Sequence, residues 1–363
     1  MNDLGNMSAF NASRPELRVS GEAVAGLAEG LLHLSVTETV EGLFTCELCL
    51  GNWGSTAGET GFMYFDRQVL DFGLDLSIVM GTGAGRAPVF DGVIMGLEGR
   101  FPRARPPELL VLAEDRAQDL RMTRRSRSFE DIPDSDVFEQ IARAHGLRAE
   151  IDVDGNHHAS LVQLNQSDLA FLRDRARAID AEVWVEGNAL FAQARGRRQA
   201  AAEVSMTYGR TLREIEILAD LAHQRSALTV AGWDVSAKDA IAENVGDDSI
   251  RGELRGAPSG SAVLQAALGE RAETLVHTLP LTSAEARTQA EAEYRRLARR
   301  FLTGVAICEG DARLKVASHV DLGGLGPLFD GVYYVTEVTH SFDGSTGFRS
   351  RIAIERPFLG AGS

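Results

Sequence analysis

The residue groups of this chain that could carry chemistry each lack the partners that their chemistry requires. Cys46 and Cys49 form a CxxC pair, a spacing found in zinc sites and in thioredoxin-like redox motifs. A zinc site needs further ligands and a redox motif lies at a helix start, but these cysteines fall in an alternating, strand-like segment. We predict structural cysteines, with one thiol in the core and the other on the opposite face.

Two other segments have the composition of binding sites. The run GTGAG at residues 81–85 is rich in glycine like a phosphate-binding loop, but a strand-like run follows it instead of the required helix, so we expect a hairpin turn. His157 and His158 lie in a polar segment without partner cysteines, which predicts a solvated loop more readily than a metal site. His340 is expected to be packed or hydrogen-bonded rather than catalytic.

The densest basic cluster contains Arg121, Arg124, Arg125 and Arg127. It could touch nucleic acid or an acidic partner, but a solvated face is the better expectation. The chain contains no GxSxG nucleophile elbow and no HExxH pair. We therefore predict no catalytic, cofactor-binding or metal-binding residue, no cofactor and no enzymatic activity.

The elements that hold these residues are mostly β at the start of the chain. Residues 1–16 are expected to be a flexible start. Residues 17–100 alternate apolar and polar types, as in Leu32, Leu34 and Val36, with glycine-rich turns between the short segments. This pattern predicts a small β-barrel.

Residues 101–204 predict an α+β unit. Asp134 or Ser135 is expected to cap one helix, and Ser167 is expected to cap a second one. Phe171 and Trp184 are expected to pack this unit. Gly187 and Asn188 form a two-residue link that suits a tight hairpin.

The last part of the chain returns to β character at residues 205–235 and 300–357. Between them, residues 236–299 predict an irregular loop and then a helix, which begins where Thr282 and Glu285 have capping-box spacing. The closing hairpin is the clearest prediction, with Gly331, Tyr334 and Val335 holding it and residues 358–363 as a tail. If Tyr334 lies in the core, Tyr334→Asp should cost several kcal/mol in stability.

The bulk composition limits the class of protein. A length of 363 residues suggests two or three domains, and 44% hydrophobic with 25% charged residues is typical of folded soluble proteins. No apolar run is long enough for a membrane span, and the start does not resemble a signal peptide. Three cysteines argue against a disulfide framework, and a net charge of -15 argues against stable nucleic-acid binding.

Five blocks of the chain, in order, match one known pattern. They are VFDGVIMGLEGRFP, the segment from LLVLAED to ARAHGL, LVQLNQSDLAFLRDRARAIDAEVWVEGNALF, LTVAGWDVSAKDAI and the closing hairpin, and together they cover about residues 89–357. The third block is the most specific. The pattern resembles the late control protein D family of contractile phage tails and the N-terminal part of VgrG-type spike proteins.

This resemblance implies a mostly β, α+β fold with two small tube-forming β-barrels, made of residues 17–100 and of residues 205–235 with 300–357. The unit at residues 101–204 would be inserted outside them, and the chain would assemble as a homotrimeric ring. The implied function is that of a structural baseplate hub of a contractile phage tail or tail-like injection system, which joins a sixfold inner tube to a threefold spike.

The partners implied by the resemblance are further copies of the chain, an inner tube or tube-initiator protein, a spike protein and other baseplate proteins. The sequence stops shortly after the hairpin, so we expect the spike to be separate and favour the late control D type. The expected location is a virion tail or tail-like particle made in a bacterial cytoplasm. Two alternatives are a tail-tip peptidoglycan hydrolase, which needs an acidic residue with a raised pKa in a cleft, and a carbohydrate-binding β module, which needs exposed aromatic residues.

Overall fold

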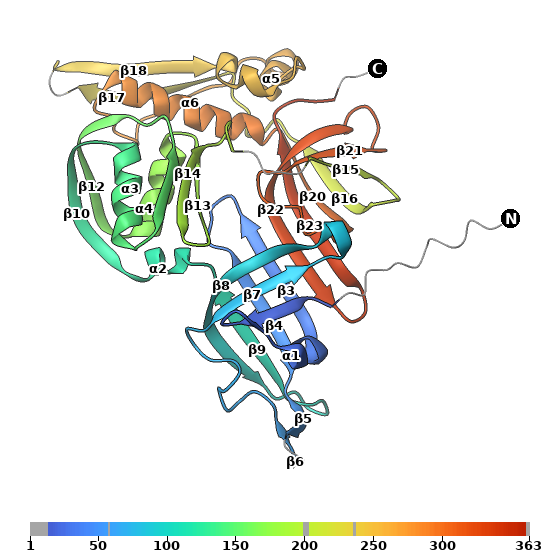
Figure 1. Ribbon diagram of the computed structural model, residues 1–363. Helices are drawn as coiled ribbons and strands as arrows, with labels where there is room; N and C mark the ends of the chain where they lie inside the picture. The colour runs from blue at the N-terminus through green and yellow to red at the C-terminus, as the bar shows by residue number, and fades with distance from the viewer. Residues whose placement is uncertain (1–13, 57–58, 199–202, 235–236, 361–363) are drawn as a thin grey trace.

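The computed structural model describes residues 14–56, 59–198, 203–234 and 237–360 of the chain. The described part is mostly β: two β-rich units share one sheet, and a peripheral α+β unit and a helical layer flank it. In Figure 1 the green peripheral unit lies to one side of the shared sheet, and the orange and yellow helical layer lies above it. Most of the predicted flexible start and half of the predicted tail lie outside the described residues.

The N-terminal β unit is built on alternating strands whose apolar face is buried. Leu34 and Val36 point into one core together with Leu48, Leu76 and Ile78. The elements of this unit are β1 (Glu16–Val19), β2 (Glu22–Ala23), α1 (Ala25–Gly30), β3 (Leu31–Thr39), β4 (Thr45–Gly51), β5 (Trp53–Thr56), β6 (Glu59–Phe62), β7 (Asp75–Met80), η1 (Gly83–Gly85), β8 (Ala87–Arg100) and β9 (Glu108–Glu114).

The C-terminal β unit has a separate core that includes Leu212, Tyr333, Val335 and Ile352. The predicted closing hairpin is confirmed, because β22 and β23 pair antiparallel across the turn between Asp343 and Gly347. The strands of this unit are β15 (Glu203–Thr207), β16 (Leu212–Ala219), β20 (Leu302–Glu309), β21 (His319–Gly323), β22 (Gly331–Asp343) and β23 (Gly347–Arg356).

Strand β22 joins the two β units. Its first residues pair with β21, and its later residues, from Glu337 to Asp343, pair with β3, while β23 pairs along its other edge. The strands therefore form one 13-stranded sheet, whose path ends at β16 and β2. We expected two separate barrels. Within the described residues the strand pairings close neither unit into a barrel, because β3 pairs with β22 of the other unit.

The peripheral unit packs helices on two small sheets around a third core, which includes Val137, Phe138, Leu172 and Leu190. The hairpin predicted at Gly187 and Asn188 is confirmed by the pairing of Glu186 with Ala189. The elements of this unit are α2 (Ala117–Met122), β10 (Arg124–Pro133), α3 (Asp134–Ala144), β11 (Arg148–Asp152), β12 (His157–Ser167), α4 (Asp168–Ala178), β13 (Ala181–Glu186) and β14 (Ala189–Ala194).

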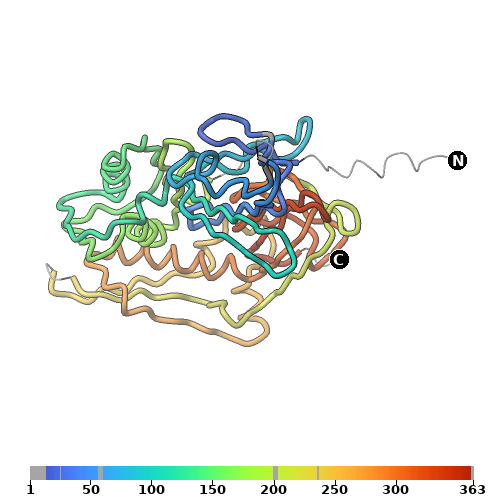
Figure 2. The backbone as a smooth tube through the Cα atoms, turned by 90° about the horizontal axis from the view of Figure 1, so that it is seen from below, coloured from blue at the N-terminus to red at the C-terminus, as the bar shows by residue number. Residues whose placement is uncertain are grey.

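The helical layer is a long helix packed on a three-stranded sheet. Ala286, Ala290 and Tyr294 recur at helical spacing and face Leu228, Val230 and other residues of the sheet. Figure 2 shows the long helix between this sheet and the peripheral unit. The elements are β17 (Ala227–Asp234), β18 (Asp239–Gly246), η2 (Asp247–Glu253), α5 (Gly260–Leu268), β19 (Ala272–Leu275) and α6 (Ser283–Arg299).

The irregular loop that we predicted between residues 236 and 280 is wrong for its described part, which contains β18, η2, α5 and β19. Only Ile241 and Val245 of β18 are buried, so the alternation in this strand is too sparse to be seen in the sequence. Pairing with β17 over its whole length supplies the order that the local pattern does not.

Candidate functional site

Two of the predicted structural residues lie in the peripheral unit. Ser167 immediately precedes α4, and its hydroxyl accepts a hydrogen bond of 3.2 Å from the backbone N–H of Ala170. Phe171 is buried in the peripheral core and stacks on Phe129, with ring centroids 5.7 Å apart. Together they fix the start and one face of α4.

Two others lie on β22. Val335 is fully buried in the C-terminal core. Gly331 begins β22 with φ +124°, and a Cβ added there would lie 2.9 Å from the Nη1 atom of Arg356. A larger residue at position 331 would therefore be strained both by its backbone conformation and by this guanidinium.

Trp184 and Tyr334 lie outside the cores of the units that contain them. In β13 the side chains of Val183 and Val185 enter the peripheral core, so Trp184 points to the opposite face, where it stacks on Phe191. In β22 the core residue is Tyr333, and Tyr334 points away from that core. The reason in both cases is the two-residue period of a strand, which places neighbours on opposite faces.

Trp184 and Tyr334 instead belong to a buried, charged junction between the peripheral unit and the shared sheet. The Tyr334 hydroxyl donates to the Glu182 carboxylate at 2.9 Å, and Arg198 donates to the same carboxylate at 2.8 Å. The Arg198 guanidinium lies over the Trp184 ring, 3.8 Å from its centroid. We call the charged residues Asp180, Glu182, Arg195, Arg198, Glu253, Arg299 and Glu355, with these two aromatic rings, the charged junction.

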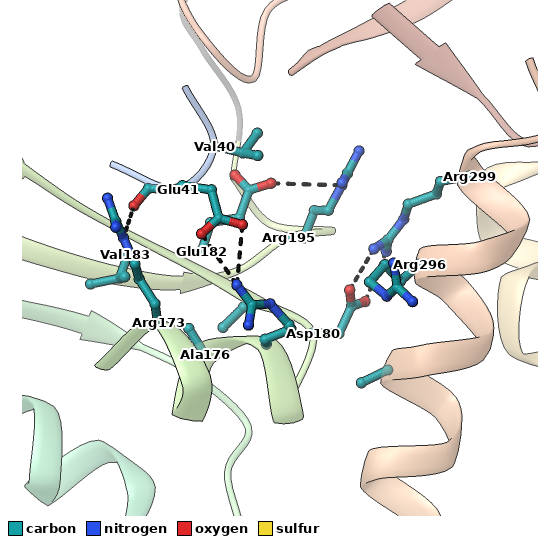
Figure 3. A pocket seen from close by; sticks show the side chains of 13 residues that line it. Val40, Glu41, Arg173, Ala176, Asp180, Glu182, Val183, Arg195, Arg296 and Arg299 are labelled. Atoms are coloured by element: carbon teal, nitrogen blue, oxygen red, sulfur yellow. Dashed lines mark hydrogen bonds and ion pairs between the residues drawn. The ribbon is translucent and has the colours of Figure 1, made fainter. Parts of the chain in front are cut away.

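Arg195 connects β14 to the closing hairpin within the charged junction. Its guanidinium donates to Glu355 of β23 and lies 4.1 Å from the centroid of the Tyr334 ring. Burial opposes the charged form of Arg195, but Glu355 and Glu182 outweigh that effect and raise its pKa. Figure 3 shows Arg195 directed at Glu182 in the hollow between the units.

Arg299 connects the last turn of α6 to the peripheral unit, through Asp180, and to η2, through Glu253. It donates to both carboxylate oxygens of Asp180, at the end of α4, and to both oxygens of Glu253 in η2. Only 4% of its side chain is exposed. Burial disfavours its charge, but these hydrogen bonds hold the pKa of Arg299 well above its usual value, and they lower the pKa of Glu253.

Sequence reasoning did not find the charged residues of this junction. One signal was available: EVWVE places Glu182 and Trp184 on the face opposite to two valines, and a tryptophan on an outward face indicates a second packing surface. The arrangement orients one unit on another through paired charges. Its chemistry is that of a rigid joint.

The CxxC pair lies on β4, with both thiols free and both side chains buried. Cys46 packs in the N-terminal core, whereas Cys49 lies on the other face with its sulfur 3.8 Å from a carboxylate oxygen of Glu108. The opposite faces were predicted, but Cys49 is covered instead of exposed. Burial raises the pKa of both thiols, which disfavours the reactive thiolate. The GTGAG run forms the turn between β7 and β8, as predicted.

His157 and His158 do not lie in a solvated loop, because both belong to β12. His158 is buried, with its Nε2 atom 3.0 Å from a carboxylate oxygen of Asp134, and Arg175 donates to the other oxygen at 2.8 Å. Asp134 is the first residue of α3 rather than its cap, because its side chain is used in this cluster. His340 is packed and hydrogen-bonded as expected, to Ser350 and to the Leu314 carbonyl.

The arginine cluster is only partly solvated, which corrects our prediction. Arg127 donates to Asp168 at 2.6 Å, and Arg125 lies 3.2 Å from the same carboxylate. Asp168 is almost completely buried and also contacts His145 at 2.9 Å. Burial opposes its charge, but the hydrogen bonds from His145 and Gln163 lower the pKa of Asp168. These arginines therefore attach β10 to the start of α4.

A cavity of about 500 Å³ lies where the N-terminal β unit meets β22, the β13–β14 turn and the segment that follows β20. Glu38 of β3 and Asp115, after β9, are buried carboxyl groups in its wall. Burial raises the pKa of Glu38 to about 7 and the pKa of Asp115 to about 6. We call this space the Glu38 cavity.

Within the described residues, no group of three or more histidine, cysteine, aspartate or glutamate side chains is arranged to hold a metal ion. In the same part of the chain, no helix is both long and apolar enough to cross a membrane.

The arrangement of units and the shared sheet resemble the folds of solved phage tail proteins. The chain is similar to the 43 kDa tail protein of prophage MuSo2 from Shewanella oneidensis, with a TM-score of 0.67 and 14% identity over 95% of this chain and 98% of that one. It is also similar to a tail protein from Neisseria meningitidis, with a TM-score of 0.68 and 12% identity over 94% and 96% of the two chains.

A third similar structure is a component of the type VI secretion system of E. coli, which is described as structurally similar to the T4 phage tail proteins gp27 and gp5. The TM-score is 0.60 and the identity 10%, over 96% of this chain and 79% of that one. No curated protein sequence matches the chain. The family model that matches is the Alg8 N-terminal domain, over residues 12–343, and the chain belongs to this family. Membership of the late control protein D family stays a prediction.

Proposed function

We propose that this protein is a structural baseplate hub of a contractile phage tail or of a tail-like injection system. In this role three copies form a ring, which joins a sixfold inner tube on one side to a separate threefold spike on the other. The observation that carries the proposal is the likeness of fold to two tail proteins over almost the whole length of both chains. The protein acts by assembly and not by catalysis.

The open ends of the shared sheet support the proposal. Within the described residues the strand path ends at β16, which pairs with β20 along one edge and makes only the isolated bridge from Leu212 to Tyr208 besides. An unpaired strand edge in a folded protein is normally protected or used for association. A ring in which neighbouring copies cover these edges would place two β units per copy around the centre and give the pseudo-sixfold symmetry that a tube requires.

An exposed aromatic cluster at the tip of the N-terminal unit also supports it. Trp53 and Phe62, on the β5–β6 hairpin at the bottom of Figure 1, are 49% and 48% exposed, and Phe101 is 66% exposed. Phe62 contacts Trp53, Phe65 and Phe101, with ring centroids 5.0 to 6.3 Å apart. Exposed aromatic patches are typical of protein–protein contacts. They are also what the carbohydrate-binding alternative needs, so binding to cell-wall glycans would favour that alternative.

The test is the native mass of the purified chain in solution, measured by light scattering on a sizing column, with and without the spike protein. The proposal predicts a species near 118 kDa, three times the 39.2 kDa of one chain. A chain that stays monomeric when the spike is present would contradict the ring.

One observation favours a second function, that of a tail-tip peptidoglycan hydrolase. Such an enzyme needs a carboxylic acid that stays protonated near neutral pH, and burial raises the pKa of Glu38 to about 7 in a cavity that also holds Asp115. The purified protein should then clear a suspension of cell walls, and Glu38→Gln should abolish the clearing. No clearing by the wild-type chain would dismiss this function.

A further inference from the structure

The Glu38 cavity has the size and wall of a small-molecule site. Its volume of about 500 Å³ falls in the range of roughly 300–1,000 Å³ that is usual for ligand pockets. The wall is formed by β3, β7, β8 and β22, by the β13–β14 turn and by the segment that follows β20. Most of the wall is apolar, as at Val36, Phe44, Leu314 and Val338.

The cationic side chains of this wall already have carboxylate partners. Arg18 contacts Glu16 at 2.6 Å, Arg116 contacts Asp75 at 3.3 Å, and Lys315 contacts Glu186 at 3.1 Å. These partners balance most of the charge of each group. Lys315 still acts on Glu38 and Arg116 on Asp91, two carboxyl groups of the same wall.

The buried carboxyl groups of the wall are not balanced in the same way. Asp115 accepts hydrogen bonds from the backbone N–H groups of Phe44 and Ala117, at 3.0 and 2.9 Å, and its only cation among the described residues is the more distant Arg173. Glu38 lies 3.8 Å from Arg198, which donates to Glu182 at 2.8 Å, and it also has Lys315 nearby and a hydrogen bond from the backbone N–H of Val316. Burial outweighs these partners and raises the pKa of both carboxyl groups. The cavity thus has an apolar wall with an excess of acidic groups.

We propose that the Glu38 cavity binds a ligand with an apolar body and one ammonium group, with the Glu38 carboxylate as the counterion. An apolar body removes wall surface from water, and a cation beside Glu38 completes a pairing that Arg198 and Lys315 supply only in part. A free amine and a lysine side chain of a partner protein both have this chemistry. The proposal does not depend on the hub function.

The test is calorimetric titration of the full chain with benzylamine and with benzyl alcohol, which has nearly the same shape but no charge. Benzylamine should bind at least about tenfold more tightly, because a charge-assisted hydrogen bond to Glu38 contributes only in the amine complex. Equal affinity of the two probes, or no binding of benzylamine, would overturn the proposal. This comparison needs no variant and does not depend on how well a variant folds.

Two variants then assign the effect to Glu38. Glu38→Gln should weaken benzylamine binding about tenfold and leave benzyl alcohol binding unchanged. The matched control is Glu98→Gln, an exposed carboxylate outside the cavity wall, which should leave both affinities unchanged. An unaltered affinity of Glu38→Gln for benzylamine would refute the role of this residue.

A third probe distinguishes the two sources of the ammonium group. Binding of Nα-acetyl-lysine amide with the same dependence on Glu38 would support a lysine side chain of a partner protein as the occupant. Binding of benzylamine alone would support a free amine with a compact apolar body.

Discussion

At the scale of single residues, the charged junction is built on buried arginines. Burial costs each guanidinium its hydration, and ion pairs with carboxylates offset that free-energy cost. Arg299 shows this most clearly, because it contacts two acidic groups from two units while 4% of its side chain is exposed. A buried ion pair adds little net stability, but removing one partner leaves the other charges uncompensated. The junction therefore specifies orientation more than it adds stability.

Arg299→Ala should lower the free energy of unfolding by about 3 kcal/mol, because the partly buried Asp180 and Glu253 would lose the cation that they share, with Arg295 left 3.7 Å from Asp180. The matched control is Arg300→Ala, the next residue, which is exposed and should change stability by less than about 0.5 kcal/mol. Urea unfolding of both variants measures the difference. Equal stability of the two variants would contradict this account of the junction.

The second prediction at this scale concerns pH. The pKa of Glu38 is raised by burial from 4.5 to about 7, so between these values the folded chain holds a proton that the unfolded chain releases. The contribution of Glu38 to the free energy of unfolding therefore falls as pH rises from about 4.5 to 7 and is constant above that range. His340, whose burial lowers its pKa from 6.5 to about 4, acts in the opposite direction over an overlapping range.

Because these effects overlap, the prediction concerns the difference between Glu38→Gln and the wild-type chain. The stability of the variant relative to wild type should increase by ~3 kcal/mol between pH 4.5 and 7.5, since glutamine has no charged form to desolvate. Denaturant unfolding at a series of pH values gives this difference. A difference that does not vary with pH would show that Glu38 is not desolvated in the fold.

The structural roles of several residues could be predicted from the sequence, because each role depends on residues nearby in the chain. Ser167 was predicted to cap α4 because a serine before an apolar helical run satisfies the first N–H groups, and its hydroxyl accepts the Ala170 N–H. Tyr334 could not be placed, because β22 has apolar residues on both faces, whereas the EVWVE pattern of β13 did mark the face of Trp184. Only the partner surface, which comes from distant parts of the chain, decides which face is core.

At the scale of elements, β22 is the strand on which the two β units depend. It pairs with β23 along one edge and with β21 and then β3 along the other. Its side chains enter both cores, since Val335 and Val338 lie in the C-terminal core and Phe342 lies in the N-terminal one. Opening this strand would separate both cores at once.

Backbone amides of β22 should therefore exchange with solvent most slowly, at a rate set by global unfolding. Amides of β16, which pairs on one edge, and of the two-stranded β5–β6 hairpin should exchange through smaller openings and much faster. Hydrogen exchange followed by mass spectrometry would test this order. Protection in β16 equal to that in β22 would indicate that its free edge is covered, as expected only in an assembled ring.

The closing hairpin was visible in the sequence because its period-two pattern is strong and its turn is short. The long-range pairing of β22 with β3 was not, since it joins segments about three hundred residues apart and leaves no local pattern. For the same reason the sequence suggested two barrels where the strands form one continuous sheet. A local sequence pattern can show that a strand exists, but the identity of its partner strands depends on distant parts of the chain.

At the scale of the whole molecule, the features of this chain are those of a component that others contact. The shared sheet has open ends, the aromatic cluster is exposed at one tip, and buried ion pairs fix the peripheral unit. The Glu38 cavity is the one feature that this account assigns to a small ligand. The hub proposal places the contacts at the sheet ends and the aromatic tip.

The most direct test of the hub proposal is electron microscopy of the purified chain mixed with its spike protein. The account predicts ring-shaped particles with threefold symmetry, in which six β units, two from each of three copies, surround a central channel. Particles that remain single chains with the spike present, or rings without two β units of each copy at the channel, would contradict it.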